Sequence, residues 1–202
     1  MIKLIETFNA TAIILAGGKS SRYGTDKSFL EVNGKSLIKT TTEILNPLFN
    51  EIIISSNKPE KFYFSNIKIV QDLKKDCGPL MGIYSCLQKT SNDINFIIAT
   101  DIPKINLKVI DKLMSFSHDY EIVVPVNNGQ YEPLFAIYNT SILKTIESLI
   151  SKDKRKISNL FSLCKTKFLN LENGEWLINI NTKNDYLNFI SKSSNKELVN
   201  EH

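Results

Sequence analysis

The chain has 202 residues and a net charge of +4, and 42% of its residues are hydrophobic and 23% charged. This composition is typical of a globular protein with a sizeable core, and we expect one domain over residues 1–202. The mild positive charge suits an enzyme that handles anionic nucleotides and does not call for nucleic acid as a partner. With neither a secretory signal nor a membrane-spanning stretch, we predict a cytoplasmic protein without membrane contact.

The cysteines argue against a disulfide framework and against a structural zinc site. Cys77, Cys86 and Cys164 are odd in number and lack zinc-ligand spacing. Cys77 has no histidine near it in the sequence that could act as its base. We therefore interpret Cys77 as a small loop residue and not as a nucleophile.

In the first half of the chain, short apolar runs alternate with amphipathic segments. The predicted strands are 12–16, 51–57, 67–72, 95–101 and 121–126, and the predicted helices are 37–45, 59–64, 80–88 and 107–116. Ser36 is expected to cap the first helix, and Asn33-Gly34 to form a hairpin turn. The alternation predicts an α/β fold with a mainly parallel sheet.

The second half is less regular. We expect a turn at 127–129, a strand at 131–138, a helix from an Asn139 cap to Ile150, a short helix at 157–163, a strand at 166–171 and a turn at 172–174. Residues 178–181 alternate with period two, which predicts that both of their asparagines face one side. Thr182 is predicted to cap a helix over 183–190 with Asp185 in its first turn, and 191–202 to fray.

Polar residues follow the predicted strands of the first half. Gly17-Gly18, Asn57, Asp72 and Asp101 stand at four strand ends. Ligands of open parallel sheets bind beyond the carboxyl ends of the strands. The pattern therefore predicts that these residues share one site.

The stretch from residue 12 to residue 27 is the most informative. Its apolar strand ends at Gly17-Gly18, where φ > 0 is allowed and backbone N–H groups can face an anion. Arg22 and Lys27 can neutralise phosphate charge. A Walker A loop is excluded because Ile13 occupies the position of its first glycine. By themselves the residues also allow an ordinary tight turn with a solvated basic rim.

The segment Leu15-Ala16-Gly17-Gly18-x-Ser20-x-Arg22-Tyr23-Gly24-x-Asp26-Lys27 resembles the signature of nucleotidyltransferases that build nucleotide-activated cofactors and sugars. Its Gly24-x-Asp26-Lys27 end is most similar to the molybdenum cofactor guanylyltransferases, which join GMP to molybdopterin. Tyr23 departs from the family, which commonly has Met there; this leaves the chemistry of the turn intact but can alter the packing beneath it.

The resemblance covers residues 11–190 and implies the Rossmann-like three-layer α/β/α nucleotidyltransferase fold, with a mainly parallel, twisted sheet. The resemblance also implies a nucleotide-binding half at 10–126 and an acceptor-binding half at 127–190, followed by a frayed tail at 191–202.

The resemblance also implies the reaction and its residues. The substrates would be GTP and molybdopterin, the cofactor Mg²⁺, and the leaving group pyrophosphate. Arg22, Lys27 and Asp101 would be catalytic, with Asp101 as the metal ligand. The nucleotide would be bound by Leu15, Ala16, Gly17, Gly18, Lys27, Asn57, Asp72, Gly78, Pro79 and Asp101, and the acceptor by Asn179, Asn181 and Arg155.

Three further segments carry this resemblance. Thr100-Asp101-Ile102-Pro103 resembles the family's metal-binding Asp-x-Pro segment, Gly78–Gly82 its Gly-Pro-Leu-x-Gly segment, and Asn179–Thr182 its Asn-x-Asn-Thr segment. Glu132-Pro133-Leu134 and Arg155 lie in the half that the family uses for the pterin substrate.

Each of these residues also has a structural interpretation. Asp101 can be a turn or capping acid before Pro103. Asp72 can contact the guanine base or the ribose, or simply end a strand. Asn181 can orient the metal or the second substrate, or satisfy a turn as a buried amide. Arg155 can pair with the acceptor's terminal phosphate or belong to a solvated basic surface.

Two other functions stay open at this point. The first is a cytidylyltransferase or sugar-phosphate nucleotidyltransferase, because these enzymes share the glycine-rich loop. The second is a non-catalytic nucleotide-binding protein. Expected partners beyond the substrates are other cofactor-biosynthesis proteins and molybdoenzymes, and the expected oligomeric state is a monomer or a weak oligomer.

Overall fold

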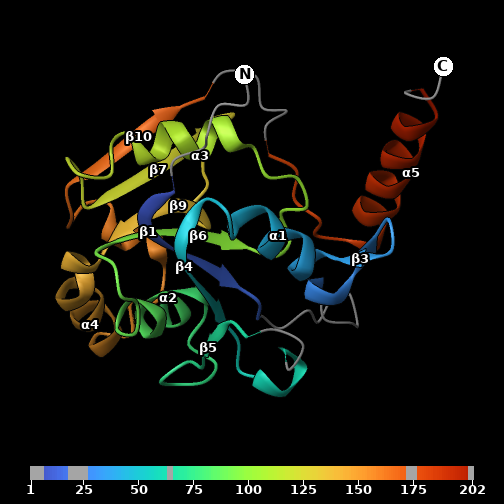
Figure 1. Cartoon of the computed structure of the whole chain (residues 1–202). Helices are drawn as coiled ribbons and strands as arrows, with labels where there is room; N and C mark the ends of the chain where they lie inside the picture. The colour runs from blue at the N-terminus through green and yellow to red at the C-terminus, as the bar shows by residue number, and fades with distance from the viewer. Residues whose placement is uncertain (1–6, 18–26, 63–65, 172–176, 200–202) are drawn as a thin grey trace.

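The computed structural model describes residues 7–17, 27–62, 66–171 and 177–199, with side chains described up to residue 191 (Figure 1). The strands are β1 (Phe8–Leu15), β2 (Glu31–Val32), β3 (Lys35–Ser36), β4 (Phe49–Ser55), β5 (Lys68–Val70), β6 (Ile94–Ala99), β7 (Ile122–Asn127), β8 (Gln130–Tyr131), β9 (Phe135–Asn139) and β10 (Thr166–Asn170). The main sheet has the spatial order β10-β7-β9-β6-β1-β4-β5, with β8 paired to β7, and β2 and β3 form a separate hairpin.

Helices cover both faces of the main sheet (Figure 1). The α-helices are α1 (Leu37–Leu45), α2 (Pro79–Leu87), α3 (Leu107–Met114), α4 (Leu143–Ser151) and α5 (Lys183–Val199), and the 3-10 helices are η1 (Lys27–Phe29), η2 (Pro59–Phe62), η3 (Thr140–Ile142) and η4 (Ile157–Leu160). Within the described part of the chain, none of these helices has the length and apolar character needed to cross a membrane.

The sheet is mainly parallel, as the alternating pattern predicted. β1 pairs in parallel with β4 and β6, β4 with β5, and β7 with β10. β9 runs antiparallel between β6 and β7. The carboxyl ends of β6, β1, β4 and β5 therefore meet at one edge of the sheet.

The apolar side chains of β1 alternate between two hydrophobic cores. Ile14 packs in the core that includes residues of α1 and α3, whereas Ile13 packs in the core that includes residues of α2 and α4. Both isoleucines are fully buried. A strand that is buried on both faces needs a continuous apolar run, which is the pattern that predicted it. The predicted three-layer arrangement is thus confirmed.

The strand predicted at 131–138 is wrong as a single element. β8 ends at Tyr131, and β9 begins only at Phe135. Pro133 has no N–H to donate to a sheet ladder, and the Phe135 N–H donates to the Glu132 carbonyl, so the chain turns between the two strands. This break lies beside the end of β6, where it affects the candidate site.

The period-two alternation predicted for 178–181 is also wrong. Ile180 is fully buried, but Ile178 is 38% exposed, and neither residue belongs to a strand. The Asn179 side chain is half-buried and that of Asn181 is exposed. The Ile180 N–H donates to the Asp101 carbonyl, and the Ile180 carbonyl accepts from Lys27 Nζ. Because these bonds do not form a strand ladder, the side chains of this segment need not face alternate sides.

The end of α5 and the cap of α1 differ from the sequence prediction. α5 continues to Val199, past the predicted end at residue 190. Its start is as predicted: the Asp185 N–H donates to Thr182 Oγ1, and the Thr182 N–H donates to Asp185 Oδ2. Ser36 lies in β3, and its side chain makes no capping hydrogen bond to α1.

The other turn and cap predictions are confirmed where they can be followed. Asn33 and Gly34 have φ values of 52° and 74°, as a hairpin turn of this type requires. Asn139 caps η3, which leads into α4. Most other boundaries shift by one to three residues. The predicted turn at 172–174 lies outside the described residues.

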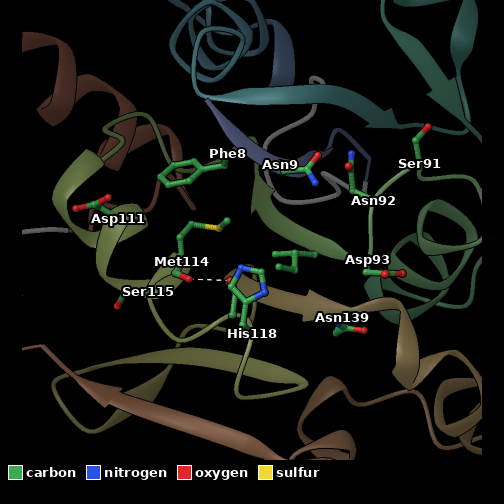
Figure 2. A pocket seen from close by; sticks show the side chains of 12 residues that line it. Phe8, Asn9, Ser91, Asn92, Asp93, Asp111, Met114, Ser115, His118 and Asn139 are labelled. Carbon is green, nitrogen blue, oxygen red and sulfur yellow. Dashed lines mark hydrogen bonds between the residues drawn. The ribbon is translucent and has the colours of Figure 1, made fainter. Parts of the chain in front are cut away.

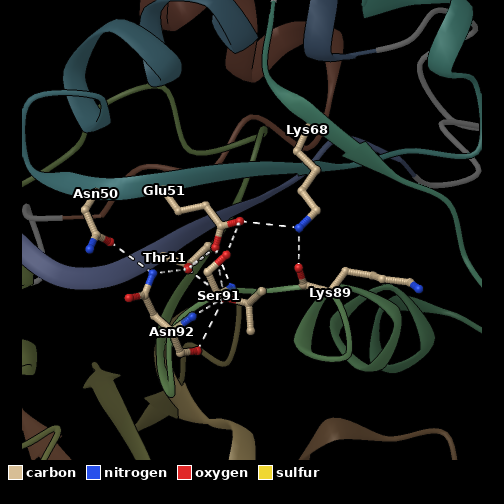
Figure 3. A network of polar contacts seen from close by, with 8 residues as sticks. Thr11, Asn50, Glu51, Lys68, Lys89, Ser91 and Asn92 are labelled. Atoms are coloured by element: carbon tan, nitrogen blue, oxygen red, sulfur yellow. Dashed lines mark hydrogen bonds and ion pairs between the residues drawn. The ribbon is translucent and has the colours of Figure 1, made fainter.

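Glu51 is the centre of a polar network at the amino edge of the sheet (Figure 3). Its Oε2 accepts from Thr11 Oγ1 at 2.7 Å and from the Ser91 N–H at 2.7 Å, and its Oε1 lies 3.4 Å from Lys68 Nζ. Lys68 also donates to the Lys89 carbonyl. Burial raises the pKa of Glu51, but the hydrogen bonds from Ser91 and Thr11 and the charge of Lys68 together hold it below its ordinary value.

Glu51→Gln is expected to lower the free energy of unfolding at neutral pH by about 1–3 kcal/mol, because hydrogen bonds to an ionised group are stronger than those to a neutral one. Since the folded-state pKa lies below the unfolded-state value, this stabilisation is complete above the unfolded-state pKa and is lost as the pH falls through the folded-state pKa. Urea unfolding of both proteins at neutral and acidic pH measures the effect, and the difference should shrink in acid.

Glu43→Gln is the matched control. Glu43 pairs with Lys35 at 2.8 Å, but about half of each side chain is exposed. Exposed ion pairs contribute little to stability. A Glu43→Gln loss as large as the Glu51→Gln loss would contradict the assignment of the network.

Candidate active site

The candidate site lies at the carboxyl edge of the sheet, where the sequence predicted it. The Ala16 N–H donates to the Ser55 carbonyl at 2.9 Å, and the Thr100 N–H donates to the Leu15 carbonyl at 3.3 Å. The Ser56 N–H donates to the Val70 carbonyl at 2.9 Å. These bonds hold the ends of β6, β1, β4 and β5 side by side and bring their polar residues together.

The glycine-rich loop is described at its first glycine only. Gly17 is not among the described residues with positive φ, so it does not use the conformation that glycine would allow there. A Cβ at Gly17 would meet the Ser55 carbonyl at 4.0 Å, which is ordinary contact. Gly18 and Arg22 lie outside the described residues, and their predicted roles stay predictions.

Lys27, Asp101 and Ile180 come together although they are far apart in the sequence. Lys27 Nζ donates to the Ile180 carbonyl at 2.8 Å and lies 3.9 Å from Asp101 Oδ2. The Ile180 N–H donates to the Asp101 carbonyl at 2.8 Å. The structure therefore places the Asn179–Thr182 segment directly beside the predicted metal ligand.

The Asp101 carboxylate is only partly compensated. Burial raises its pKa, and the charge of Lys27 offsets this effect without cancelling it. The Asp101 side chain is still 32% exposed to solvent, so an ion from solution can reach it. A half-buried carboxylate with one cation 3.9 Å away fits a role in binding a second cation.

A pair of hydroxyl groups positions Lys27. Ser28 Oγ and Thr100 Oγ1 lie 3.2 Å apart in the interior. Ser28 belongs to η1, and Thr100 follows β6. This contact ties η1 to the end of β6 and so keeps Lys27 on the same side as Asp101.

Asn57 and Asp72 form a reciprocal pair across the ends of β4 and β5. Asn57 Nδ2 donates to Asp72 Oδ2 at 2.8 Å, and the Asp72 N–H donates to Asn57 Oδ1 at 3.0 Å. Burial raises the pKa of Asp72, and the hydrogen bond from Asn57 offsets only part of this effect. The pair fixes the direction of the Asp72 carboxylate, which keeps acceptor capacity for a ligand.

The segment Gly78–Gly82 brings α2 close to this pair. Gly78 precedes α2 with φ +75°, a conformation that favours glycine, and Pro79 occupies the first turn of the helix. A Cβ at Gly82 would lie 2.9 Å from Ser55 Oγ and 3.3 Å from Asp72 Oδ1. Gly82 therefore allows the helix to approach the carboxyl ends of β4 and β5.

Gly82→Ala is expected to lower the free energy of unfolding by about 1–3 kcal/mol, because the added methyl group overpacks this contact. Helix propensity alone predicts the opposite sign, a gain of about 1 kcal/mol. Urea unfolding decides between the two effects. The Ser55→Ala background removes the nearest atom, so the same substitution should cost less there; equal losses in both backgrounds would contradict the steric explanation.

The structure separates the three predicted acceptor residues. Arg155 pairs with Asp153 at 2.7 Å and donates to the Asp76 carbonyl at 3.2 Å, in the loop before α2. Among the described residues, neither Asn179 nor Asn181 is hydrogen-bonded to Arg155. Asn179 and Asn181 flank Ile180 beside Asp101, whereas Arg155 lies near the start of α2.

The sequence did not predict that Glu132 lies near Asp101 at the carboxyl edge of the sheet. In the antiparallel pairing of β6 with β9, Ile98 is opposite Phe135, and the Ala99 N–H donates to the Leu134 carbonyl at 3.0 Å. Glu132 lies two residues before Leu134, in the turn that leads into β9. Burial, together with the negative charge of Asp101, raises the pKa of Glu132. The sequence shows an acid before Pro133, but it does not show that β9 pairs antiparallel with β6.

The donor set at this edge suits a hard cation. Among the described residues, no group of three or more His, Cys, Asp or Glu side chains could enclose a metal ion. Mg²⁺ commonly uses one or two protein carboxylates and completes its shell with water and substrate phosphates. Asp101 fits this mode of binding.

A cavity of about 600 Å³ lies at the opposite, amino edge of the sheet (Figure 2). Phe8 at the start of β1 and Ile94 at the start of β6 line it, together with His118. Asn139, at the end of the antiparallel strand β9, lines it as well. The cavity is therefore at the other end of the strands from Lys27 and Asp101, and it is not part of the candidate site.

Comparison with known proteins relates this architecture to one family. The family model of the MobA-like NTP transferase domain matches residues 12–166. A probable molybdenum cofactor guanylyltransferase of Natranaerobius thermophilus is 39% identical over 196 residues, covering 89% of this chain and 94% of the relative. A protein of the same name from Carboxydothermus hydrogenoformans is 33% identical, covering 94% of this chain and 99% of the relative.

Solved structures share the fold. Molybdopterin-guanine dinucleotide biosynthesis protein A from Archaeoglobus fulgidus superposes with a TM-score of 0.81 at 23% identity, covering 92% of this chain and 99% of the other. A 4-diphosphocytidyl-2C-methyl-D-erythritol synthase from Anaerococcus prevotii superposes with a TM-score of 0.71 at 15% identity, covering 92% and 98%. The sequence matches and the shared architecture together show that the chain belongs to the MobA-like NTP transferase family and is a nucleotidyltransferase.

Proposed function

We propose that the enzyme transfers GMP from GTP to molybdopterin in a Mg²⁺-dependent reaction that gives molybdopterin guanine dinucleotide and pyrophosphate. The observation that supports this most is the convergence of Lys27, Asp101 and the Asn179–Thr182 segment at the carboxyl edge. Relatives that are 30–39% identical are named molybdenum cofactor guanylyltransferases.

In this reaction an oxygen of the acceptor phosphate attacks the α-phosphorus of GTP. The bond from the α-phosphorus to the bridging oxygen breaks, and the electron pair leaves with pyrophosphate. Both reactants are anions, so the site must neutralise charge and align them. Lys27 would contact the triphosphate, and Arg22 is proposed to do the same. Asp101 would hold Mg²⁺, which when bound supplies positive charge to the phosphates.

Asp72 is the proposed determinant of base choice. Its carboxylate, held by Asn57, can accept from both the N1–H and the 2-amino group of guanine. Adenine and cytosine lack this pair of adjacent donors. Gly78 and Pro79, at the start of α2, would leave room for the base beside Asp72.

The test is pyrophosphate release from GTP, CTP and ATP with Mg²⁺ and molybdopterin. Release with GTP alone would support the proposal, and Asp72→Asn should then weaken the preference for GTP. Release with CTP alone would contradict the base assignment and favour a cytidylyltransferase. A protein that binds a nucleotide but releases no pyrophosphate would contradict the choice of acceptor or the catalytic role.

A further inference from the structure

Asp72 lies in a stretch of backbone that side chains hold in place. β5 ends at Val70, and Asp72 follows two residues later. The Asp72 N–H donates to Asn57 Oδ1 at 3.0 Å, and the Leu73 N–H donates to Ser85 Oγ at 3.0 Å. Two successive N–H groups beyond the end of β5 are therefore bound by side chains, one from the residue after β4 and one from α2.

These two bonds fix the two peptide planes that flank the Cα of Asp72. A residue has only two soft backbone dihedrals, φ and ψ, and each is the rotation of one flanking plane. Asn57 holds the plane before Asp72, and Ser85 holds the plane after it, which carries the Leu73 N–H. The direction in which the Asp72 side chain leaves the backbone is therefore set from both sides, and Asn57 Nδ2 also holds the carboxylate itself.

The Ser85 hydroxyl is oriented to accept the bond from Leu73. Ser85 lies in α2 and is only 2% exposed. Its hydroxyl donates to the Met81 carbonyl, one turn earlier in the helix, at 2.8 Å. A hydroxyl has one proton and two lone pairs, so this bond uses the proton and leaves the oxygen as an acceptor. Ser85→Ala would remove the acceptor of the Leu73 N–H and add no atoms.

We propose that Ser85 is a positioning residue for base recognition and that it acts through Asp72. The inference rests on the proposed function in one respect, the assignment of the Asp72 carboxylate to the guanine base. A carboxylate that accepts from two adjacent N–H groups of a planar base must face both of them, and hydrogen bonds weaken steeply as they bend. Ser85 would thus contribute to the preference for guanine without contacting the base.

α2 faces Asp72 at a second point as well. A Cβ at Gly82, in the same helix, would lie 3.3 Å from Asp72 Oδ1. The helix therefore lies against the carboxylate at Gly82 and against the following peptide at Ser85. Of these two contacts, only the one at Ser85 is a hydrogen bond that a substitution can remove without overpacking.

Nucleotide binding tests this proposal without catalysis. Isothermal titration calorimetry of the full-length enzyme, with Mg²⁺ and without acceptor, measures the dissociation constants of GTP and of ITP, whose base lacks the 2-amino group. The preference for GTP over ITP reports the contact of that group with Asp72. Ser85→Ala is expected to lower this preference by about three- to tenfold, because a misdirected carboxylate makes a poorer hydrogen bond. Binding of inorganic triphosphate, which has no base, should stay unchanged.

A double variant tests whether Ser85 acts through Asp72. In an Asp72→Asn background the carboxylate that Ser85 positions is already absent. Adding Ser85→Ala to Asp72→Asn should therefore leave the preference for GTP over ITP where Asp72→Asn alone put it. A further loss of preference in the double variant would contradict the route through Asp72.

Ser117→Ala is the matched control. Ser117 is equally buried, and its hydroxyl donates to the Met114 carbonyl at 2.7 Å, but it lies beside the cavity at the opposite edge of the sheet. Ser117→Ala removes a similar buried hydroxyl and should leave the preference for GTP over ITP unchanged. Thermal unfolding compares the stability of Ser85→Ala with that of Ser117→Ala.

The outcomes separate this proposal from the base assignment on which it rests. A Ser85→Ala protein that keeps the full preference for GTP, or that does not fold, would overturn the positioning role, while Asp72→Asn still tests the base assignment by itself. Equal weakening of GTP, ITP and inorganic triphosphate would also overturn the positioning role. An unmodified protein without a preference for GTP over ITP would overturn the base assignment and this proposal together.

Discussion

Asp101→Asn is expected to lower the rate of guanylyl transfer by about 10³-fold or more, because it removes the charge that would hold the metal ion at the reacting phosphates. The protein should stay folded. Burial raises the pKa of Asp101, so its ionised form is costly in the absence of the metal, and a neutral amide of the same shape removes that cost. The measurement is pyrophosphate release at saturating GTP, with thermal unfolding in parallel.

Asp111→Asn is the control for Asp101→Asn. Asp111 is an exposed acid on α3 and lines the cavity at the opposite edge of the sheet (Figure 2). It should leave the transfer rate unchanged. An Asp101→Asn enzyme with full activity would contradict the metal assignment, and one that does not fold would show that Asp101 acts mainly on stability.

Lys27→Met is expected to lower kcat/KM for GTP by about 10²–10³-fold, since it removes a preorganised cation from an anionic transition state. Lys27 is 18% exposed, and its Nζ is held by the Ile180 carbonyl, so little reorganisation is needed when substrate binds. Lys27→Arg keeps the charge but changes the donor geometry, and it should recover only part of the activity. Steady-state kinetics with GTP as the varied substrate measures both variants.

Two further variants test whether the effect of Lys27→Met is specific to the site that Lys27 shares with Asp101. Lys35→Met removes a lysine from the β2–β3 hairpin, where it pairs with Glu43, and should leave kcat/KM unchanged. The double variant Lys27→Met with Asp101→Asn should lose less than the product of the two single losses, because both residues act on the same phosphates. Independent, multiplying losses would contradict a shared site.

For the described residues of the first half, the sequence predicted which ones lie together at the carboxyl edge, and it did so for a physical reason. Strands buried on both faces need continuous apolar runs, and in a parallel sheet the residues that follow such runs meet at one edge. This reasoning brought Asn57 and Asp72 together and placed Asp101 beside the end of β1. It needed only local patterns and the rule for parallel connections.

The second half could not be predicted in the same way. A buried antiparallel strand has the same apolar pattern as a parallel one, so the insertion of β9 between β6 and β7 was not visible, and neither was the position of Glu132. The contact between Lys27 and the Ile180 carbonyl joins residues 153 positions apart and involves a backbone atom, which leaves no mark on residue type. Arg155 was grouped with the asparagines by resemblance alone.

Transfer of label from GTP to the acceptor measures the central reaction most directly. The enzyme is incubated with molybdopterin, Mg²⁺ and GTP that carries ³²P at either the α- or the γ-position, and the labelled dinucleotide product is separated and counted. We predict label in the product from the α-position only, with none from the γ-position and none with Asp101→Asn. Label from the γ-position, or an unlabelled product from α-labelled GTP, would contradict GMP transfer at this site.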